Sequence, residues 1–253
     1  MCTLIIAHRK WHETPLFVAA NRDEALDRPS RGPTIHWADD VPVLAPKDLR
    51  AGGTWIGLSG FGLFAAVTNR FGAAPDPNRP SRGQIVLDAL TQDCPADAIA
   101  AILDHAQDVY NPFHLVVADR NEAHLLINWG TRIEHRELEP GIHVITERSF
   151  AAVPSPREEI IDSNLLAIGG RKPPGEETWI DILSRHNDNP WAATCVHGPE
   201  GKYGTRSSTL LQLGASSEYT RYLYADAPPC HASFIDLSPQ ARQLLDWRPG
   251  QEL

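Results

Sequence analysis

Apolar residues near the start of the chain form short runs separated by polar or glycine-rich segments. The runs at residues 3–8 and 16–20 are divided by a polar stretch that contains Pro15. Short apolar runs bounded by turn residues are typical of β-strands. Three further runs, at residues 43–45, 54–57 and 63–68, are punctuated by Gly52-Gly53 and Gly60-Phe61-Gly62. This part of the chain therefore predicts successive strands of a mainly antiparallel sheet.

The spacing of apolar residues changes after Gly83. Apolar residues now recur at intervals of three and four, which is the period of an amphipathic helix. They are Ile85, Val86, Ala89 and Leu90, then Ala98, Ile99, Ile102, Leu103 and Ala106. Pro95 is accepted in a first helical turn, and Asp97 complements the positive end of the helix dipole. We therefore predict a pair of helices here.

Strands and helices alternate in blocks along the rest of the chain. Strands are predicted at residues 113–118, 125–129, 143–146, 208–213, 219–224 and 232–235, and helices at about 156–168, at 178–185 and from Ser238-Pro239 onward. Blocks of strands with helices in pairs between them indicate two layers of sheet covered by helices. The glycine- and proline-rich segment 169–175 is too short for a convincing domain linker.

Length and charge limit the classes of protein. The chain has 253 residues, of which 42% are hydrophobic, so it can bury one substantial core, and we expect one domain over residues 1–253. The net charge is −9, so a nucleic-acid backbone would be repelled over most of the surface. No stretch approaches the roughly 20 apolar residues that span a bilayer. A small molecule is the expected partner, and the oligomeric state is left open.

The cysteines and the first residues indicate a reducing compartment. The apolar run after Met1 is shorter than the roughly 7 to 15 residues of a signal peptide. Cys2, Cys94, Cys195 and Cys230 lie far apart without a Cys-x-x-Cys pair. This pattern fits reduced thiols better than disulfides or a structural zinc site. The 11 histidines are scattered along the chain. We therefore expect a cytoplasmic protein without a metal site.

Cys2 is the first candidate for chemistry. Removal of Met1 is expected when the second residue is small, and it would place the thiol and a free α-amine on one residue. The amine has a pKa of about 7.7–8.0 and can accept the thiol proton without a histidine. N-terminal threonine and cysteine hydrolases work by this logic. From the position alone, a cysteine that merely begins a buried strand is the more common case.

Four polar residues, Asn21-Arg22-Asp23-Glu24, follow the apolar run 16–20. If residues 16–20 pair with the strand of Cys2, these four residues lie near the thiol. The arginine would then favour the thiolate, and the aspartate would orient the α-ammonium group. A solvated turn with mutual ion pairs is the alternative interpretation of the same residues.

A series of short motifs covers roughly residues 1–210. The motifs are Cys2, Asn21-Arg22-Asp23-Glu24 with Arg28-Pro29, Gly52-Gly53-Thr54-Trp55-Ile56-Gly57, Ala66-Val67-Thr68-Asn69-Arg70, Ser81-Arg82-Gly83, Asn111-Pro112-Phe113, Pro140-Gly141 with His143, and Gly204-Thr205-Arg206-Ser207-Ser208-Thr209. In the order and spacing of these motifs, the chain resembles the NRDE family, the family of transport and Golgi organisation protein 2.

This family in turn is similar to the cysteine-type N-terminal-nucleophile hydrolases, which include choloylglycine hydrolases and penicillin V acylases. The resemblance implies an α+β fold, a four-layer αββα sandwich of two mainly antiparallel sheets. It also implies that Cys2 is the nucleophile, that Arg22 and Asp23 organise it, and that Asn69 contributes to the oxyanion site. Arg206 corresponds to an arginine near the active site of these hydrolases.

Glu147 departs from the pattern that the resemblance implies. Relatives carry Ser-Asn at the position where the hydrolases place a second oxyanion asparagine, whereas this chain has Thr146-Glu147. A carboxylate repels a developing oxyanion, and losing one such donor costs about 10²–10³ in rate. Asn128 is a candidate replacement, although the sequence does not place it.

Two functions follow from the resemblance. The first is a cysteine N-terminal-nucleophile hydrolase that cleaves an amide C–N bond or a thioester of a small acyl substrate and needs no cofactor. The second is a non-catalytic binding protein for haem or for an acyl or lipid ligand, because the family is implicated in haem trafficking and lipid homeostasis. The sequence has no Cys-x-x-Cys-His motif, so any haem would be a non-covalent, transported ligand.

Overall fold

The computed structural model describes residues 2–72, 75–106, 109–151, 155–165, 170 and 172–252. Its strands form two sheets in which all pairs of neighbouring strands are antiparallel. The first sheet runs in the order β10 (Gly141–Thr146), β1 (Cys2–Trp11), β2 (Thr14–Ala25), β11 (Tyr203–Leu213), β12 (Arg221–Ala225) and β13 (Ile235–Asp236). The second runs β3 (Ser30–Ala38), β4 (Val41–Asp48), β5 (Ile56–Ser59), β6 (Phe64–Asn69), β7 (Phe113–Ala118), β8 (Ala123–Asn128) and β9 (Ile133–Glu137).

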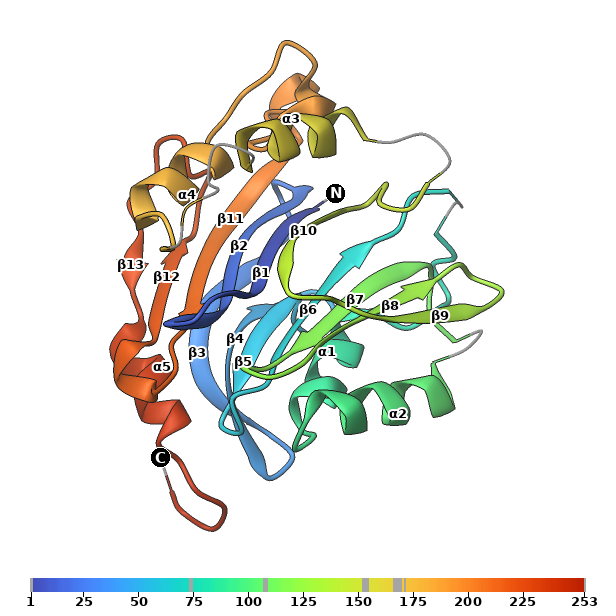
Figure 1. The fold of residues 1–253 in the computed structure, drawn as a ribbon. Coiled ribbons are helices and arrows are strands. Elements are labelled where there is room, and N and C mark those ends of the chain that lie inside the picture. The colour runs from blue at the N-terminus through green and yellow to red at the C-terminus, as the bar shows by residue number, and fades with distance from the viewer. Residues whose placement is uncertain are drawn as a thin grey trace.

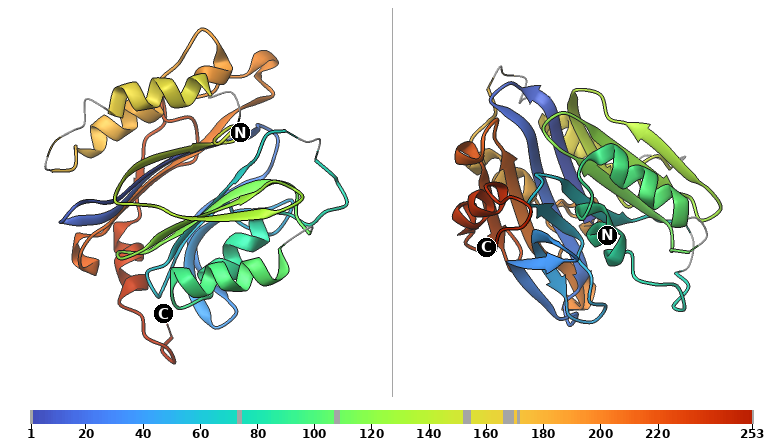
Figure 2. Two further views of the ribbon diagram at one scale, coloured as in Figure 1. Left: turned by 45° about the vertical axis from the view of Figure 1, so that its right-hand side comes forward. Right: turned by 90° about the horizontal axis from the view of Figure 1, so that it is seen from below.

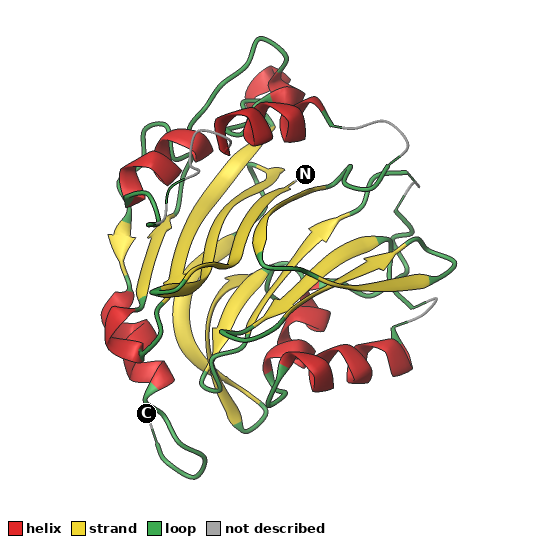
Figure 3. Cartoon of the chain, viewed as in Figure 1, coloured by secondary structure: helices red, strands yellow, loops and turns green. Residues whose placement is uncertain are grey.

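Helices cover the outer faces of the two sheets (Figure 1). Helices α3 (Pro156–Leu165) and α4 (Glu176–Leu183) lie on the first sheet, and α1 (Gly83–Leu90) and α2 (Pro95–His105) lie on the second. Helix α5 (Ser238–Leu245) closes one side of the sandwich, and short 3₁₀ turns occur at Pro190–Ala192, Pro199–Gly201 and Ser217–Tyr219. The views in Figures 2 and 3 show the resulting four layers. The predicted αββα sandwich is therefore confirmed.

The strands of the first sheet are apolar on both faces, because one face meets the other sheet and the other meets helices. Leu4 and Ile6 of β1 belong to the core between the sheets, whereas Ile5 and Ala7 pack with Trp179 and the rest of the helical layer. A strand that is buried on both faces becomes a continuous apolar run. This alternation also fixes the direction of Cys2, which shares the inward face with Leu4 because side chains alternate along a strand.

Most predicted elements match the structure, and the two strands that were not predicted are edge strands. β3 and β9 stand at the two ends of the second sheet. β3 contains Pro33 and β9 reads Ile-Glu-His-Arg-Glu. Edge strands tolerate proline and charged residues, because one side of an edge strand is not paired, and such residues conceal the apolar pattern of a strand. The end of the predicted helix 156–168 lies outside the described residues.

One predicted boundary is wrong in a way that bears on function. Asn21-Arg22-Asp23-Glu24 was expected to follow the second strand, but all four residues lie within β2. β11 pairs with all four of these residues, and β1 also pairs with Asn21 and Arg22, so the interpretation as a solvated turn is excluded. Among the described residues, none of the helices combines the length and the apolar character needed to cross a membrane.

A buried histidine makes the stability of this fold sensitive to acid. Burial and the nearby Arg70 lower the pKa of His114 in β7 to about 4, and its Nδ1 lies 3.2 Å from the hydroxyl of Thr68. The neutral form is favoured in the folded state, so stability is complete above pH 6.5 and is lost as the pH falls toward 4. We expect this single group to cost about 3 kcal/mol over that range.

Urea unfolding at pH 7 and pH 4 measures this effect. The His114→Gln variant should lose about 3 kcal/mol less than the wild type between the two pH values, because it has no imidazole to protonate. The exposed His12→Gln variant should behave like the wild type. Equal losses in all three proteins would show that His114 does not couple folding to pH.

Candidate active site

The site lies where the start of β1 is paired with the end of β2. Cys2 stands directly opposite Arg22 in the register of these antiparallel strands, so both side chains project from the inward face of the sheet. The thiol is half-buried. Burial raises the pKa of Cys2, and Asp23 raises it further, whereas a hydrogen bond from the Asp23 backbone and the charge of Arg22 lower it. The thiol therefore needs a base to react at neutral pH.

Arg22 is a buried cation whose guanidinium remains available for a ligand. It lies over the ring of Trp55 at 4.1 Å, which is a cation–π contact. Its Nη2 is 3.7 Å from Asp48 and 3.9 Å from Glu24, so the ion pairs are long. Neither Nη1 nor Nη2 has a hydrogen-bond partner within the described part of the chain. Arg28 takes the closer contact with Asp48, at 2.7 Å.

Asp23 points to the opposite face of the first sheet, toward the helical layer. Its carboxylate lies 3.0 Å from Nη1 of Arg157 in α3, and neither side chain is exposed to solvent. The hydroxyl of Thr205 donates to the same carboxylate at 2.7 Å, and Arg157 also donates to Thr3 at 3.0 Å. Burial raises the pKa of Asp23, against the lowering effect of Arg157 and Thr205. A fixed, buried carboxylate thus lies one residue from Arg22.

Two glycine-containing motifs form the wall opposite Cys2. A Cβ atom on Gly53 would lie 2.5 Å from the backbone carbon of Gly83, and one on Gly83 would lie 2.9 Å from the carbonyl oxygen of Thr54. Only glycine allows this approach. The Thr54 amide donates to the Gly83 carbonyl at 3.2 Å. The contact holds Trp55 and Arg82 at the same wall, so these two motifs serve one site.

These elements enclose a cavity of about 490 Å³. Charged and polar side chains dominate its lining, which comprises Cys2, Arg22, Asp23, Glu24, Arg28, Asp48, Ala51, Thr54, Trp55, Val67, Asn69, Pro75, Asp76, Pro77, Arg79, Pro80, Ser81, Arg82, Gly83 and Asn111. The exposed Asn69 amide makes no side-chain hydrogen bond with the described residues, whereas Asn111 is engaged on both sides by the backbone of Asp76. Asn69 is therefore free to donate to a ligand.

The structure brings four of the five predicted site residues to this cavity, namely Cys2, Arg22, Asp23 and Asn69. Arg206 is not among the lining residues. It falls in a bulge of β11, where the register with β2 shifts between Thr205 and Ser207. The neighbouring Thr205, rather than Arg206, therefore contacts Asp23.

Glu147 and Asn128 also lie outside the lining of the cavity. Glu147 is buried after β10, and its backbone carbonyl accepts a hydrogen bond from the Phe71 amide at 2.7 Å. Asn128 is buried in β8 and its side chain accepts from the Gly130 amide at 2.7 Å, which makes it a turn residue. Neither side chain therefore lines the cavity in front of Cys2, and Asn128 does not supply the missing asparagine there.

Comparisons with known proteins agree with this architecture. A family model described as Transport and Golgi organisation 2 matches residues 1–222. The Transport and Golgi organization protein 2 homolog of Bos taurus is 28% identical over 81% of this chain and 84% of its own length. The homolog of Homo sapiens is 28% identical over 92% of this chain and 89% of its own length.

Solved structures with the same fold are more distant in sequence. The penicillin V acylase from Agrobacterium tumefaciens aligns with a TM-score of 0.52 at 16% identity, over 94% of this chain and 86% of its own. The Caenorhabditis elegans ortholog of N-acylethanolamine-hydrolyzing acid amidase aligns with a TM-score of 0.57 at 16% identity, over 86% and 96%. A mutant conjugated bile acid hydrolase from Clostridium perfringens aligns with a TM-score of 0.56 at 10% identity, over 94% and 93%. The N-terminal-nucleophile hydrolase-like fold predicted from the sequence is therefore confirmed.

Proposed function

The chain belongs to the Transport and Golgi organisation 2 family, and we propose that it is a cysteine hydrolase that cleaves an amide or a thioester of a small acyl substrate. One observation carries the proposal: Cys2 and Arg22 face each other across β1 and β2 and open, with Asn69, into one polar cavity. The solved structures with the same fold are an acylase, an amidase and a bile acid hydrolase, which supports hydrolysis.

The proposed reaction requires that Met1 be removed. The α-amine of Cys2 then accepts the thiol proton, and the sulfur attacks the substrate carbonyl to form a C–S bond. The Asn69 amide donates to the resulting oxyanion, and the buried negative charge of Asp23 stabilises the α-ammonium group. Collapse of the intermediate breaks the C–N or C–S bond of the substrate, and the leaving group takes the proton from the ammonium. Water then hydrolyses the acyl-enzyme by the same proton relay.

Two arginines of the cavity favour a substrate with an anionic group. Arg82 donates one hydrogen bond, to the Pro112 carbonyl at 3.1 Å, and no carboxylate of the described residues forms an ion pair with it. The hydrogen-bonding groups of Arg22 are likewise available. Two such guanidinium groups beside the nucleophile would bind a carboxylate through paired N–H donors. We therefore propose an N-acyl amino acid, or a similarly charged acyl conjugate, as the substrate class.

A second candidate function is the non-catalytic binding of haem or of an acyl or lipid ligand. It is favoured by another cavity of about 540 Å³, lined by Phe71, Arg148, Ser155, Pro156, Asn189, Trp191 and Tyr203. Phe71 and Trp191 are 57% and 45% exposed, so an apolar ligand would find aromatic surface there. No histidine, cysteine or methionine of the described chain lines this cavity, and the hydroxyl of Tyr203 donates to the Asp23 carbonyl at 2.8 Å, so an acyl chain is a better fit than haem.

The proposal places the protein in the cytoplasm. The described Cys2, Cys94, Cys195 and Cys230 are free thiols. Reduced cysteines are maintained in that compartment, and a thiol nucleophile depends on it.

A panel of matched substrates tests the proposed function. One acyl group is presented as an N-acyl amino acid, as a neutral amide and as a thioester, beside a spectroscopic titration with haem. We expect turnover of the anionic member, and we expect Arg82→Gln to raise its KM by about tenfold or more, because a charged hydrogen bond is worth about 1.5–3 kcal/mol. The KM of the neutral amide should hardly change.

The control for this panel is Arg132→Gln, which removes an exposed guanidinium outside the cavity and should behave like the wild type. Equal effects of Arg82→Gln on the charged and neutral substrates would contradict the role of Arg82. Absence of turnover together with saturable haem or acyl-chain binding would replace the hydrolase by the binding function.

A further inference from the structure

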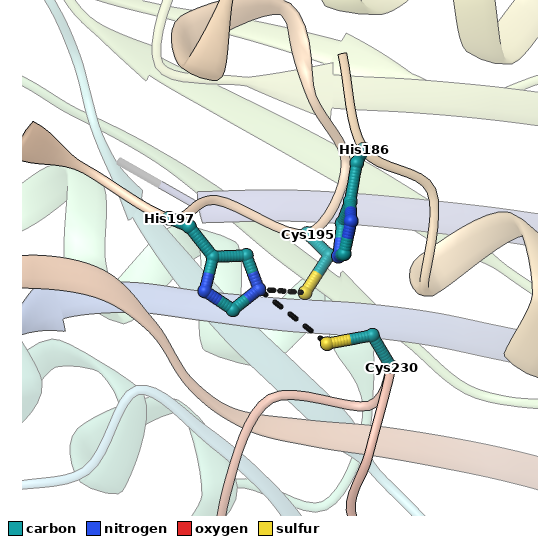
Figure 4. Close-up of side chains that lie close together, drawn as sticks. All are labelled: His186, Cys195, His197 and Cys230. Carbon is teal, nitrogen blue, oxygen red and sulfur yellow. Dashed lines mark hydrogen bonds between the residues drawn. The ribbon is translucent and has the colours of Figure 1, made fainter. Parts of the chain in front are cut away.

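Folding brings together four metal-ligating side chains that are separated in the sequence. His186 follows α4, Cys195 and His197 precede β11, and Cys230 lies in the connection between β12 and β13. One ligand atom of each side chain lies within 4.8 Å of the others, and Figure 4 shows them turned toward a common point. The spacing along the sequence predicts no such site, because the cysteines do not form a Cys-x-x-Cys pair and Cys230 follows His197 by 33 residues.

The distances in this cluster suit tetrahedral zinc. With Zn–S bonds of about 2.3 Å and Zn–N bonds of about 2.0–2.1 Å, sulfur and nitrogen ligands at tetrahedral angles lie about 3.5 Å apart. Nε2 of His197 is 3.5 Å from Sγ of Cys195 and 3.4 Å from Sγ of Cys230. A set of two thiolates and two imidazoles in this geometry selects Zn²⁺ among the common divalent ions. Small rotamer changes would close the longer ligand–ligand distances.

Two of the three segments that carry the ligands are already fixed to each other. The Cys195 amide donates to the Arg185 carbonyl at 2.9 Å, which places His186 beside Cys195. The side-chain amide of Asn21 donates to the carbonyls of Leu183 and Thr194, both at 2.9 Å. A preorganised site of this kind binds a metal without the entropy cost of assembling its ligands.

We propose that His186, Cys195, His197 and Cys230 bind one Zn²⁺ ion in a closed structural site. Binding displaces the two thiol protons, and four protein ligands leave no open position for catalysis. The ion would join the connection between β12 and β13 to the segment that precedes β11. The observations that support this zinc site do not depend on the hydrolase function.

The proposed zinc site is also connected to the active site by a chain of hydrogen bonds. Val196 stands between two of the ligands, and its amide donates to the Thr205 hydroxyl at 2.8 Å. The Thr205 amide donates back to the Val196 carbonyl at 2.9 Å. Thr205 in turn donates to the Asp23 carboxylate. Zinc would therefore fix the residue that holds Asp23.

Metal analysis of the full-length protein, expressed with zinc and purified under reducing conditions, tests the site. We expect one zinc ion per chain, a melting temperature that falls when a chelator removes the ion, and, after exchange for Co²⁺, the thiolate charge-transfer bands of tetrahedral cobalt. Cys230→Ser and His186→Gln should weaken zinc binding by more than about 100-fold, since losing even an outer partner of a ligand typically costs 10- to 100-fold.

Two of the four ligands can be replaced with little expected effect on folding. Cys195 is buried, whereas Cys230 is half-buried and His186 is exposed, so the latter two are the informative substitutions. Cys94→Ser removes a thiol at the start of α2 and should retain the zinc. Zinc well below one ion per chain, full retention in Cys230→Ser, or a disulfide between Cys195 and Cys230 in place of the metal would overturn the proposal.

Discussion

Cys2→Ala should reduce the turnover of the best acyl substrate by about 10⁴-fold or more, because losing the nucleophile removes covalent catalysis and leaves only binding and oxyanion stabilisation. The substitution keeps an N-terminal α-amine after removal of Met1, so the base remains while the thiol is absent. Its cost in stability should be small, since the side chain is half-buried and smaller than its apolar neighbours. Initial rates at saturating substrate, together with thermal unfolding, measure both quantities.

The matched control is Cys94→Ala, which removes a thiol that does not line the cavity and should retain wild-type turnover. Turnover that persists at the wild-type rate in Cys2→Ala would exclude Cys2 as the nucleophile. A loss of similar size in Cys94→Ala would mean that the substitution of a cysteine outside the cavity also lowers turnover, so the effect of Cys2→Ala would not identify the nucleophile.

Arg157→Met should destabilise the fold by about 3–5 kcal/mol at pH 7, because it removes the buried cation that is paired with the Asp23 carboxylate. Both side chains of this ion pair are inaccessible to solvent, and their atoms are 3.0 Å apart. Burial already raises the pKa of Asp23, so without Arg157 the carboxyl group should take up a proton readily. The deficit should therefore shrink as the pH falls and Asp23 becomes neutral.

Urea unfolding of Arg157→Met at pH 7 and at pH 5 measures this expectation. The double variant Asp23→Asn with Arg157→Met should recover part of the loss, because neither member of this pair is then charged. Lys202→Ala breaks an exposed ion pair with Glu200 and should leave stability unchanged. A loss below about 1 kcal/mol in Arg157→Met would mean that Asp23 has another compensating partner.

The layers of the fold could be predicted because β1 and β2 are apolar on both faces and α1 and α2 on one. These patterns reflect burial, which the sequence records directly. β3 and β9 could not be predicted because edge strands carry proline and charge. The end of β2 was predicted too early because Arg22 and Asp23 are polar residues inside a strand. Their polarity is needed at the site and interrupts the apolar pattern of the strand.

The sequence predicts the part of the site whose residues lie on strands that are close together along the chain. Cys2, Arg22 and Asp23 lie on neighbouring strands joined by a short turn, so their register follows from the hairpin. Arg157 is 134 residues from Asp23, and no spacing rule connects a helix of the outer layer to a strand end. The four proposed zinc ligands could not be predicted for the same reason, since they lie on three segments that meet only after folding.

The most direct test of the central claim is mass analysis of the N-terminal peptide. The protein is made in cells and mixed briefly with a thioester substrate that it hydrolyses. The account predicts that Met1 is absent, that the peptide begins at Cys2, and that the acyl group appears on this peptide and disappears as product forms. Quantitative retention of Met1 in protein that turns the substrate over, or an acyl group carried by another residue, would contradict it.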